Sequence, residues 1–332
     1  MKGQQMAAEM AEQPEVLARL AERAVAQVEA VRTLLPRPLA ATVFLARGSS
    51  DNAAVYGRYL AELASGRPSG LAAPSLYTRY RAQVDWRGCL VVALSQSGAT
   101  PEIVTTCRAM RAAGAVTVGI TNDANSELSS IVDLVLSTDA GAEVAIPATK
   151  TVTAQMLLVM MVAEALGSVE VTPEQLLMLS AAVQSILADP LPIDRLARRW
   201  AHVDRLIIAG RGLGYAAALE CALKVKETTG ILAEGISTAD LRHGPIATVY
   251  AGAPVLLVDT GGPVAADLDE LRQLLTDRHA DVVTLPLGPS LPEPLQVIAA
   301  VVRGQQLARD VALMRGADPD APEKLSKVTL TA

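Results

Sequence analysis

The stretch LVVALSQSGATPE, residues 90–102, passes from strand to loop to helix. Residues 90–94 are an uninterrupted apolar run, which is typical of a strand buried on both faces. Pro101 can begin a helix because its missing N–H removes no hydrogen bond in a first turn, and Thr100 can occupy the preceding cap position. A strand that leads directly into a helix predicts one unit of a parallel sheet.

Similar units surround this stretch. Apolar runs predict further strands at 41–46, 116–120 and 132–136. Helical spacing of apolar residues predicts helices over 6–35 and 51–65. Because strands alternate with helices, the first half of the chain predicts a parallel sheet covered by helices on both faces.

The second half of the chain repeats the first. The tripeptides ARG at 46–48 and GRG at 210–212 each end an apolar run, 164 positions apart, and the strand ends Leu94 and Leu257 lie 163 positions apart. Two landmarks with nearly the same offset indicate duplication of one α/β unit. Strands are predicted at 206–209, 255–259 and 282–285, with helices over 214–229 and up to residue 275. The predicted fold class is α/β, with two tandem three-layer α-β-α domains, each a doubly wound parallel sheet flanked by helices.

This pattern divides the chain into five segments. We expect an N-terminal helical segment at 1–34, a first α/β domain at 35–168, a helical connector at 169–192, a second α/β domain at 193–315 and a C-terminal tail at 316–332.

Composition narrows the classes of partner. The formal net charge is −6 and the charges are well mixed, without the basic stripe that nucleic-acid binding requires. The most apolar helical stretch, around 156–163, is far shorter than the ~20 residues that span a bilayer, and no signal peptide begins the chain. Cys89, Cys107 and Cys221 form no CxxC pair and no metal-ligand spacing with the three histidines. We therefore expect a cytoplasmic protein with buried free thiols and no membrane or nucleic-acid partner.

The loop SQSGAT at 95–100 has the chemistry of an anion site. It follows a predicted parallel strand, at the end of the sheet where ligands collect, and precedes a helix whose unpaired N–H groups favour an anion. Gly98 leaves room for close approach of a ligand. Hydroxyl and amide donors are available from Ser95, Gln96, Ser97 and Thr100. The local alternative is a capped helix start with polar turn residues.

A neighbouring strand end and the second copy refine this interpretation. RGSS at 47–50 could supply one more hydroxyl, from Ser50. The second copy has DTGG at 259–262 in place of SQSGAT, and Asp259 would repel a phosphate. If the chain has one phosphate site, the first copy holds it. No GxxxxGK[ST] motif is present, and GRGLG at 210–214 lacks the third spacing of a dinucleotide fingerprint.

Three further residues, Glu227, His243 and Lys327, can each be explained by their local sequence without a role in catalysis. Glu227 can pair with Lys224, which can also pair with Glu220, on a helix face laced with ion pairs. His243 lies in a loop, where a lone histidine is usually structural or solvated. Lys327 is a tail lysine, although apolar and polar residues alternate through 325–330 as if this stretch docks on something.

These pieces occur together in one family. The chain resembles the SIS (sugar isomerase) double-domain proteins, and among them the isomerase half of glucosamine-6-phosphate synthase and the stand-alone SIS-type glucosamine-6-phosphate deaminases. The motifs that carry the resemblance are MAAEMAEQP at 6–14, GSS at 48–50, SQSG at 95–98, TK at 149–150, ALKVKE at 222–227, HGP at 243–245 and LSKVT at 325–329. Each motif is weak alone, and their order over nearly the whole chain is typical of the family.

The resemblance implies two tandem SIS domains and a role for each residue singled out above. The phosphate of a hexosamine or hexose 6-phosphate would be held by Ser50, Ser95, Gln96, Ser97 and Thr100. Glu227 would move a proton between C1 and C2 of the open-chain sugar, and His243 would assist ring opening from the other subunit of a homodimer. Lys327 would close over the sugar with the tail. No metal and no organic cofactor is implied.

The reaction that we expect from the resemblance is hydrolytic deamination of glucosamine 6-phosphate to fructose 6-phosphate and ammonia. The glutaminase domain of the synthase is missing from the sequence, so net synthesis from glutamine is not expected. Arg47 and Ala148 stand where the family has Cys and Ser beside two of the motifs. The open alternatives are aldose–ketose isomerisation, deglycation of a phosphorylated Amadori sugar, galactosamine-phosphate deamination, dehydration of N-acetylglucosamine 6-phosphate, and a non-catalytic sugar-phosphate sensor.

Overall fold

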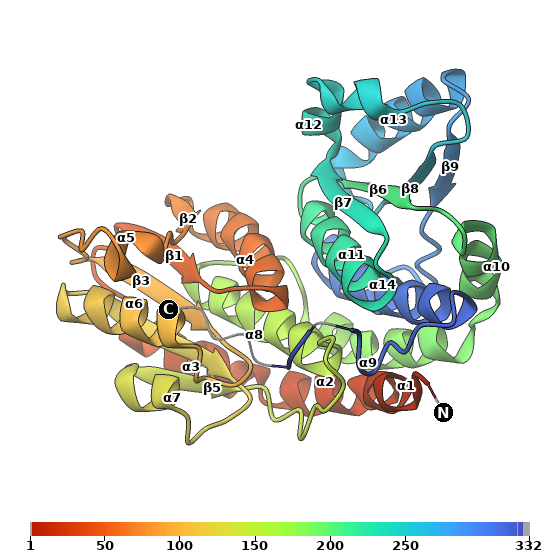
Figure 1. Ribbon diagram of the computed structural model, residues 1–332. Helices are drawn as coiled ribbons and strands as arrows, with labels where there is room; N and C mark the ends of the chain where they lie inside the picture. Colours follow the sequence, from red (N-terminus) through yellow and green to blue (C-terminus); the bar gives the residue numbers. More distant parts are fainter. Residues whose placement is uncertain (1, 324, 328–332) are drawn as a thin grey trace. The chain divides into compact units, whose positions relative to one another are not determined.

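A computed structural model describes residues 2–323 and 325–327 (Figure 1). These residues cluster into two compact units. Unit A contains residues 15–143 and 150–173, and unit B contains residues 2–14, 144–149, 174–323 and 325–327. The five predicted segments are consecutive ranges of the sequence, whereas the two units group residues that lie close together in space. The bounds of the five segments therefore stay a prediction.

Unit A is built on a five-stranded, fully parallel sheet with the order β2-β1-β3-β4-β5. Its strands are β1 (Ala41–Leu45), β2 (Ser69–Leu71), β3 (Cys89–Leu94), β4 (Val116–Thr121) and β5 (Leu134–Ser137). Its helices are α3 (Ala24–Leu34), α4 (Ser49–Ser65), α5 (Ser75–Thr78), α6 (Pro101–Ala112), α7 (Glu127–Ile131) and α8 (Lys150–Leu166).

Both faces of the unit A sheet are covered by helices. Phe44 points to the face where α4 and α8 pack, and its ring lies beside Val159 of α8 next to Gly57 of α4. Its neighbour Leu45 points to the opposite face, because successive side chains of a strand alternate. There Leu45 joins a buried cluster with residues of β3, α6 and α7, including Val91, Ala93, Ile103, Cys107 and Leu128.

Unit B has a four-stranded parallel sheet with the order β7-β6-β8-β9. Its strands are β6 (Arg205–Gly210), β7 (Leu232–Ser237), β8 (Pro254–Val258) and β9 (Asp281–Thr284). Its helices are α1 (Gln4–Ala11), α9 (Pro173–Ala188), α10 (Leu191–Trp200), α11 (Gly214–Thr229), α12 (Thr238–Arg242), η1 (Pro245–Thr248), η2 (Gly262–Val264), α13 (Ala265–Asp277) and α14 (Glu293–Met314).

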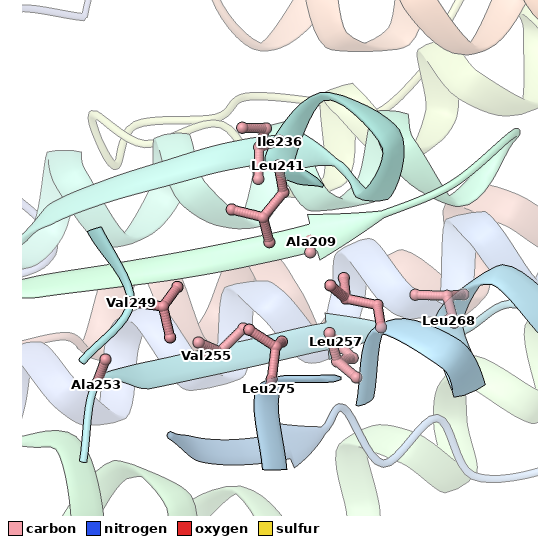
Figure 2. Close-up of a cluster of buried hydrophobic side chains, with 10 residues drawn as sticks. Ala209, Ile236, Leu241, Val249, Ala253, Val255, Leu257, Leu268 and Leu275 are labelled. Carbon is pink, nitrogen blue, oxygen red and sulfur yellow. The ribbon is translucent and has the colours of Figure 1, made fainter. Parts of the chain in front are cut away.

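Helices also cover both faces of the unit B sheet. On one face α11 packs against β6, β7 and β8, and α14 packs behind α11. On the other face α12 and α13 close a core that is entirely aliphatic (Figure 2). That core consists of Ala209, Ile236, Leu241, Val249, Ala253, Val255, Leu257, Leu268, Leu271 and Leu275.

The strand order confirms the predicted repeat. The first four strands of unit A and the four strands of unit B follow one order, in which the second strand precedes the first and the third follows it. The register matches as well, since Leu45 pairs with Ala93 in unit A and Ala209 pairs with Leu257 in unit B. The α4–α8 pair of unit A has its counterpart in the α11–α14 pair of unit B. The α/β class with two parallel sheets is therefore as predicted.

The single helix predicted over 6–35 is wrong. The chain forms three helices there, α1, α2 (Gln13–Glu22) and α3. Pro14 explains the first break, because it has no N–H to donate to the carbonyl of Met10 and a helix cannot continue through it. At the second break the Arg23 N–H bonds to the Leu20 carbonyl, three residues back, at 3.1 Å.

Within the described part of the chain, no single helix is long and apolar enough to cross a membrane. The pair α9 and α10, bent by 55° at their junction, meets the length and composition criteria only when the two are taken together.

Candidate functional site

The predicted anion loop lies where the strand order of unit A reverses. From β1 the chain moves to β2 on one side and then to β3 on the other, so the loops after β1 and β3 leave neighbouring strands at the same edge. Ligands of open parallel sheets bind at such a switch point, beyond the carboxyl ends of the strands. Ser50 follows β1, and the loop from Ser95 to Thr100 follows β3, so the five predicted phosphate ligands share this edge.

The loop is folded tightly on its own atoms. Gly98 N–H donates to the Ser95 carbonyl at 3.1 Å, and the Ser95 and Thr100 hydroxyl oxygens lie 3.2 Å apart. Gly98 has a φ of 60°, and a Cβ there would overlap Ser126 Oγ and lie 2.9 Å from Thr121 Oγ1. Only glycine meets both constraints without strain. The loop backbone therefore passes closely over the loop that follows β4.

The polar groups of the loop keep donor capacity for a ligand. Thr100 occupies the N-cap position of α6, as predicted, but its side chain makes no capping hydrogen bond to the helix. Ser97 Oγ accepts a bond from the Ala99 N–H at 3.3 Å, which leaves its own hydroxyl proton available. Ser95 is buried, whereas Gln96 and Ser97 are partly exposed. Hydroxyl donors beside the positive end of a helix dipole form a favourable environment for an anion.

An ion pair joins the two loops of the switch point. Arg47, at the end of β1, donates from Nε to Glu102 Oε2 in the first turn of α6 at 2.9 Å. Glu102 is nearly buried, so Arg47 balances a carboxylate that would otherwise oppose an anion at this edge. Asp51 lies in the first turn of α4, where burial raises the pKa of its carboxyl and the nearby Arg47 charge offsets part of that rise.

Unit B repeats this ion pair. Arg211, at the end of β6, donates from Nε to Asp267 Oδ2 in the first turn of α13 at 3.0 Å. In both units an arginine at the end of the first strand bonds a carboxylate of the helix that follows the third strand. We call Arg47–Glu102 and Arg211–Asp267 the strand-end ion pairs. Their recurrence indicates a structural role that both repeats share.

The chemistry beside the strand-end ion pair differs in unit B. Asp259 takes the place of the hydroxyl-rich loop and accepts a bond from the Gly261 N–H at 3.0 Å. A second carboxylate, that of Glu293, lies so close to Gly262 that a Cβ there would overlap Glu293 Oε2. Burial raises the pKa of Glu293. The sequence pointed to Asp259 alone, and the structure adds Glu293. Arg272 of α13 lies 3.9 Å from Asp259 and offsets part of the negative charge that disfavours a phosphate at this edge.

Glu227 lies on α11 in a cluster of charged side chains. Lys224 donates from Nζ to Glu227 Oε2, and its Nζ lies 3.6 Å from Glu220 Oε1. The side chains of Lys224 and Glu220 are 1% exposed, whereas that of Glu227 is 24% exposed. The ion pairs expected on this helix face are present, and two of the three charged side chains are buried. Glu227 is the one carboxylate of this cluster that solvent reaches.

His243 and Lys327 occupy different settings in unit B. His243 follows the last residue of α12, its N–H bonds to the Asp240 carbonyl at 3.1 Å, and its side chain is exposed. Lys327 is partly buried and donates from Nζ to the carbonyl of Ala145 at 2.7 Å. The motif residues Val328 and Thr329 and the apolar residue 330 lie outside the described residues.

The structure gathers the predicted site residues in two groups. Unit A holds the five predicted phosphate ligands, and unit B holds Glu227, His243 and Lys327. Cys107 and Cys221 are buried free thiols as predicted, and burial raises the pKa of Cys107 to about 12. Cys89 is only half-buried, because it begins β3 at the rim of the sheet.

Comparison with known proteins gives the same family along most of the chain. The SIS domain model matches residues 41–165 and 201–288, which are the two sheet-containing regions. The chain is 32% identical over 303 residues to glutamine–fructose-6-phosphate aminotransferase (isomerizing) of Methanothermobacter thermautotrophicus. That match covers 86% of the chain and 50% of the relative, so the chain spans about half the length of the curated relatives it matches.

Solved structures share the whole fold. A protein of Silicibacter pomeroyi DSS-3, whose assignment as a phosphosugar isomerase is itself provisional, has a TM-score of 0.86 and 29% identity over 96% of this chain and 100% of its own. Glucosamine-6-phosphate deaminase of Thermotoga maritima has a TM-score of 0.83 and 24% identity over 98% and 100% of the two chains. At that identity the second likeness shows the fold alone.

Proposed function

This chain belongs to the SIS domain family, and we propose that within it the chain is an aminosugar-phosphate deaminase that converts glucosamine 6-phosphate and water to fructose 6-phosphate and ammonia. The observation that carries the proposal is the difference between the repeats. One switch point offers hydroxyl donors to an anion, and the equivalent one presents two carboxylates. A single phosphate grip per chain suits a substrate with one phosphate.

In this proposal the loop of unit A binds the 6-phosphate. Ser95, Ser97, Thr100 and Ser50 donate from their hydroxyls and Gln96 from its amide, at the N-terminal ends of α4 and α6. Binding energy from the phosphate, which does not react, holds the other end of the sugar for the chemical step. The strand-end ion pair Arg47–Glu102 keeps the two loops at a fixed spacing.

Glu227 is the proposed base. After the ring opens, its carboxylate removes the proton at C2 of the amino-aldose and a proton is delivered to C1. The C1 oxygen gains the proton that the nitrogen loses, which leaves a hydroxyl at C1 and a ketimine at C2. Water adds to the ketimine carbon, and the C–N bond then breaks to give the ketose and ammonia. The partial exposure of Glu227 supports this role, since the carboxylate is reachable while buried Lys224 fixes its orientation.

His243 and Lys327 complete the proposal. His243 would protonate or deprotonate the ring oxygen during opening, because imidazole titrates near neutral pH, and we propose that it acts in the partner subunit of a homodimer. Its exposure supports such a role. Lys327 would act at the open-chain carbonyl or hydroxyl oxygen. The free cysteines fit a reducing compartment, so we also propose a cytoplasmic location.

One substrate panel tests the reaction class. Purified protein is incubated with glucosamine 6-phosphate, galactosamine 6-phosphate, N-acetylglucosamine 6-phosphate, fructosamine 6-phosphate and fructose 6-phosphate, while ammonia and ketose are measured. Ammonia with fructose 6-phosphate from the first substrate alone supports the proposal. Turnover of another substrate instead replaces deamination by the corresponding isomerisation, deglycation or dehydration. Tight binding without turnover of any substrate replaces the enzyme by a sugar-phosphate sensor.

The role of Glu227 is tested by Glu227→Gln. We expect the variant to bind the sugar phosphate as the parent does and to lose exchange of solvent deuterium into C1 and C2, by about a thousandfold. Glu234→Gln is the matched control, because Glu234 is an exposed carboxylate on β7 of the same unit. Undiminished exchange in Glu227→Gln would remove Glu227 from the mechanism.

The role of the partner subunit is tested by mixing two inactive variants. Glu227→Gln and His243→Ala are unfolded together, refolded as a mixture and assayed. If His243 acts in the partner subunit, one of the two sites in each mixed dimer is intact, so about one quarter of the parent activity should return. Equal inactivity of the mixture and the separate variants would show that His243 serves its own chain.

A further inference from the structure

The tail of unit B is tied to the first helix of the chain. Asp320 accepts two hydrogen bonds from the N-terminal turn of α1, from Met6 N–H to Oδ1 at 2.7 Å and from Gln5 N–H to Oδ2 at 3.1 Å. The first N–H groups of a helix have no partner inside the helix, and the helix dipole favours negative charge there. Asp320 therefore caps α1 from a position more than 300 residues later in the chain.

Asp318 braces this cap. Its Oδ1 accepts from the Asp320 N–H at 3.1 Å and from the Gly3 N–H at 3.2 Å. Lys2 adds a hydrogen bond from its Nζ to the carbonyl of Gly316. The tail is thus fixed to the residues around α1 at several successive points before it reaches Lys327.

The same helix also holds the segment that Lys327 contacts. Glu9 of α1 is fully buried, and its Oε1 accepts from the N–H groups of Val144 and Ala145 and from Gln5 Nε2 at 2.9 Å. The Ala145 peptide is therefore held at its N–H by α1, while its carbonyl accepts the bond from Lys327.

Asp320 links the two ends of this arrangement. Its carboxylate is bound to α1, and its own carbonyl accepts from the Ile146 N–H at 3.0 Å, beside the peptide that Lys327 contacts. The tail and the segment at 144–146 thus meet twice, once at Asp320 and once at Lys327. At Asp320 the tail itself is bonded to α1, whereas at Lys327 the helix holds the segment that the tail contacts.

We propose that Asp320 is a positioning residue that holds Lys327 in place for the reaction. This inference rests on the proposed function, which gives Lys327 a task at the sugar. Asp320 touches no reacting atom and acts by tying the chain to α1 seven positions before Lys327. A shorter tether confines the lysine to a smaller volume and lowers the entropy lost when it engages the substrate.

Asp320→Asn tests the proposal, since it keeps the shape of the side chain and removes its charge and one acceptor oxygen. We expect kcat for the sugar phosphate to fall about tenfold while KM changes less than about twofold, because the phosphate grip is untouched and only the placement of Lys327 suffers. Asp320→Glu should recover part of the loss. Asp269→Asn, at an exposed position on α13, should leave both constants unchanged.

A second measurement does not depend on turnover. Trypsin cleaves after lysine, so the rate of cleavage after Lys327, followed by intact mass, reports how well the tail is held. We expect Asp320→Asn to raise this rate at least about fivefold. If Asp320→Asn does not fold, Asp318→Asn, which removes only the brace, should raise it to a smaller extent.

The outcomes separate this inference from the proposed function. Faster cleavage together with a selective loss of kcat supports the positioning role. Unchanged cleavage, or an unchanged kcat in a protein that Glu227→Gln inactivates, overturns the inference and leaves the proposed function standing. If no substrate of the panel is turned over, the proposed function fails, and unchanged cleavage would then reject the tail anchor as well.

Discussion

Units A and B share a strand order and a strand-end ion pair, but the side chains beside that ion pair differ in charge. Each has a strand-end ion pair that spans the switch point, Arg47–Glu102 in unit A and Arg211–Asp267 in unit B, with bond lengths of 2.9 and 3.0 Å. Beside it unit A presents Ser95, Ser97 and Thr100, and unit B presents Asp259 and Glu293. The residues that form the strand-end ion pair are therefore not the residues that a ligand would contact in the neighbouring loop.

The largest expected effect comes from the glycines of the two loops. Gly98→Ala must place a Cβ against Ser126 at a φ of 60°, whereas Gly261→Ala has a φ of 78° with nothing within 4 Å of the added atom. We expect Gly98→Ala to weaken sugar-phosphate binding by about a hundredfold and to lower the free energy of unfolding by about 2–4 kcal/mol.

Gly261→Ala is the control for backbone strain alone, and we expect it to cost about 1 kcal/mol with no change in binding. Calorimetric titration with the sugar phosphate and denaturant unfolding measure both quantities. Equal binding losses in the two variants would show that the loops do not differ in function.

A charge swap tests the chemistry of the loops directly. Ser97→Asp gives unit A the carboxylate that unit B already has, and we expect it to weaken binding of the sugar phosphate about thirtyfold through repulsion at close range. Ser97→Ala, which removes one hydroxyl and adds no charge, should cost about three- to tenfold. Inhibition by inorganic phosphate in the substrate assay gives both values. Tighter binding by Ser97→Asp would contradict an anion site.

The strand-end ion pairs should respond alike in stability and differently in binding. Arg47→Ala and Arg211→Ala each remove one ion pair from a carboxylate, and both arginines are partly exposed. We therefore expect each to lower the free energy of unfolding by about 0.5–1.5 kcal/mol. Only Arg47→Ala should also raise KM, about three- to fivefold, because Glu102 then opposes the phosphate. An equal rise of KM in Arg211→Ala would contradict the assignment of phosphate binding to unit A alone.

The smallest effect concerns Glu293, the partly buried acid beside Gly262 in unit B. Burial raises the pKa of Glu293 above its ordinary value of 4.5, so the folded state holds this proton more tightly than the unfolded state does. The contribution of Glu293 to the free energy of unfolding therefore declines as the pH rises from 4.5 through the raised pKa. Glu293→Gln removes this loss, and we expect its Tm to exceed that of the parent by about 1–3 °C at pH 7 and by less at pH 4. A constant difference across this range would contradict the shift.

The sequence predicts the strands and helices that carry a clear apolar period. β1, β3, β4, β6, β8 and β9 all coincide with predicted apolar runs, and α4, α6 and α11 begin or end within two residues of the predicted positions. β2 and β7 were missed, because β2 has only three residues and the LAEGIS run of β7 is interrupted by Glu234 and Gly235.

α14 was missed for a different reason. It is buried along almost its whole length, so it lacks the polar face that marks a surface helix. Arg303 is buried within it because its guanidinium donates to the carbonyls of Pro286, Ile186 and Asp189 at 2.7–3.0 Å. Those acceptors lie outside the sequence around Arg303, so local composition does not predict these hydrogen bonds.

The candidate site likewise has a part that local sequence patterns predict and a part that depends on contacts between distant residues. The loop at 95–100 was recognisable because strand, loop and helix signals are contiguous in sequence. The burial of Lys224 and Glu220 was not predicted, because i,i+4 spacing describes a helix face without saying what covers it. The hydrogen bonds of Asp320 to α1 join residues near the two ends of the chain, and Glu9 likewise gains the N–H groups of Val144 and Ala145 only through the fold.

The strand-end ion pair has a consequence for how such a protein can change over time. In unit B, Arg211–Asp267 joins the end of β6 to α13, and Asp259 of the neighbouring loop lies 3.9 Å from Arg272 of the same helix. Because Arg211 and Asp267 both lie outside the loop at 259–262, exposed positions of that loop can change while this ion pair stays in place. A different ligand preference could therefore be engineered into this loop of unit B while the loop of unit A is left unchanged.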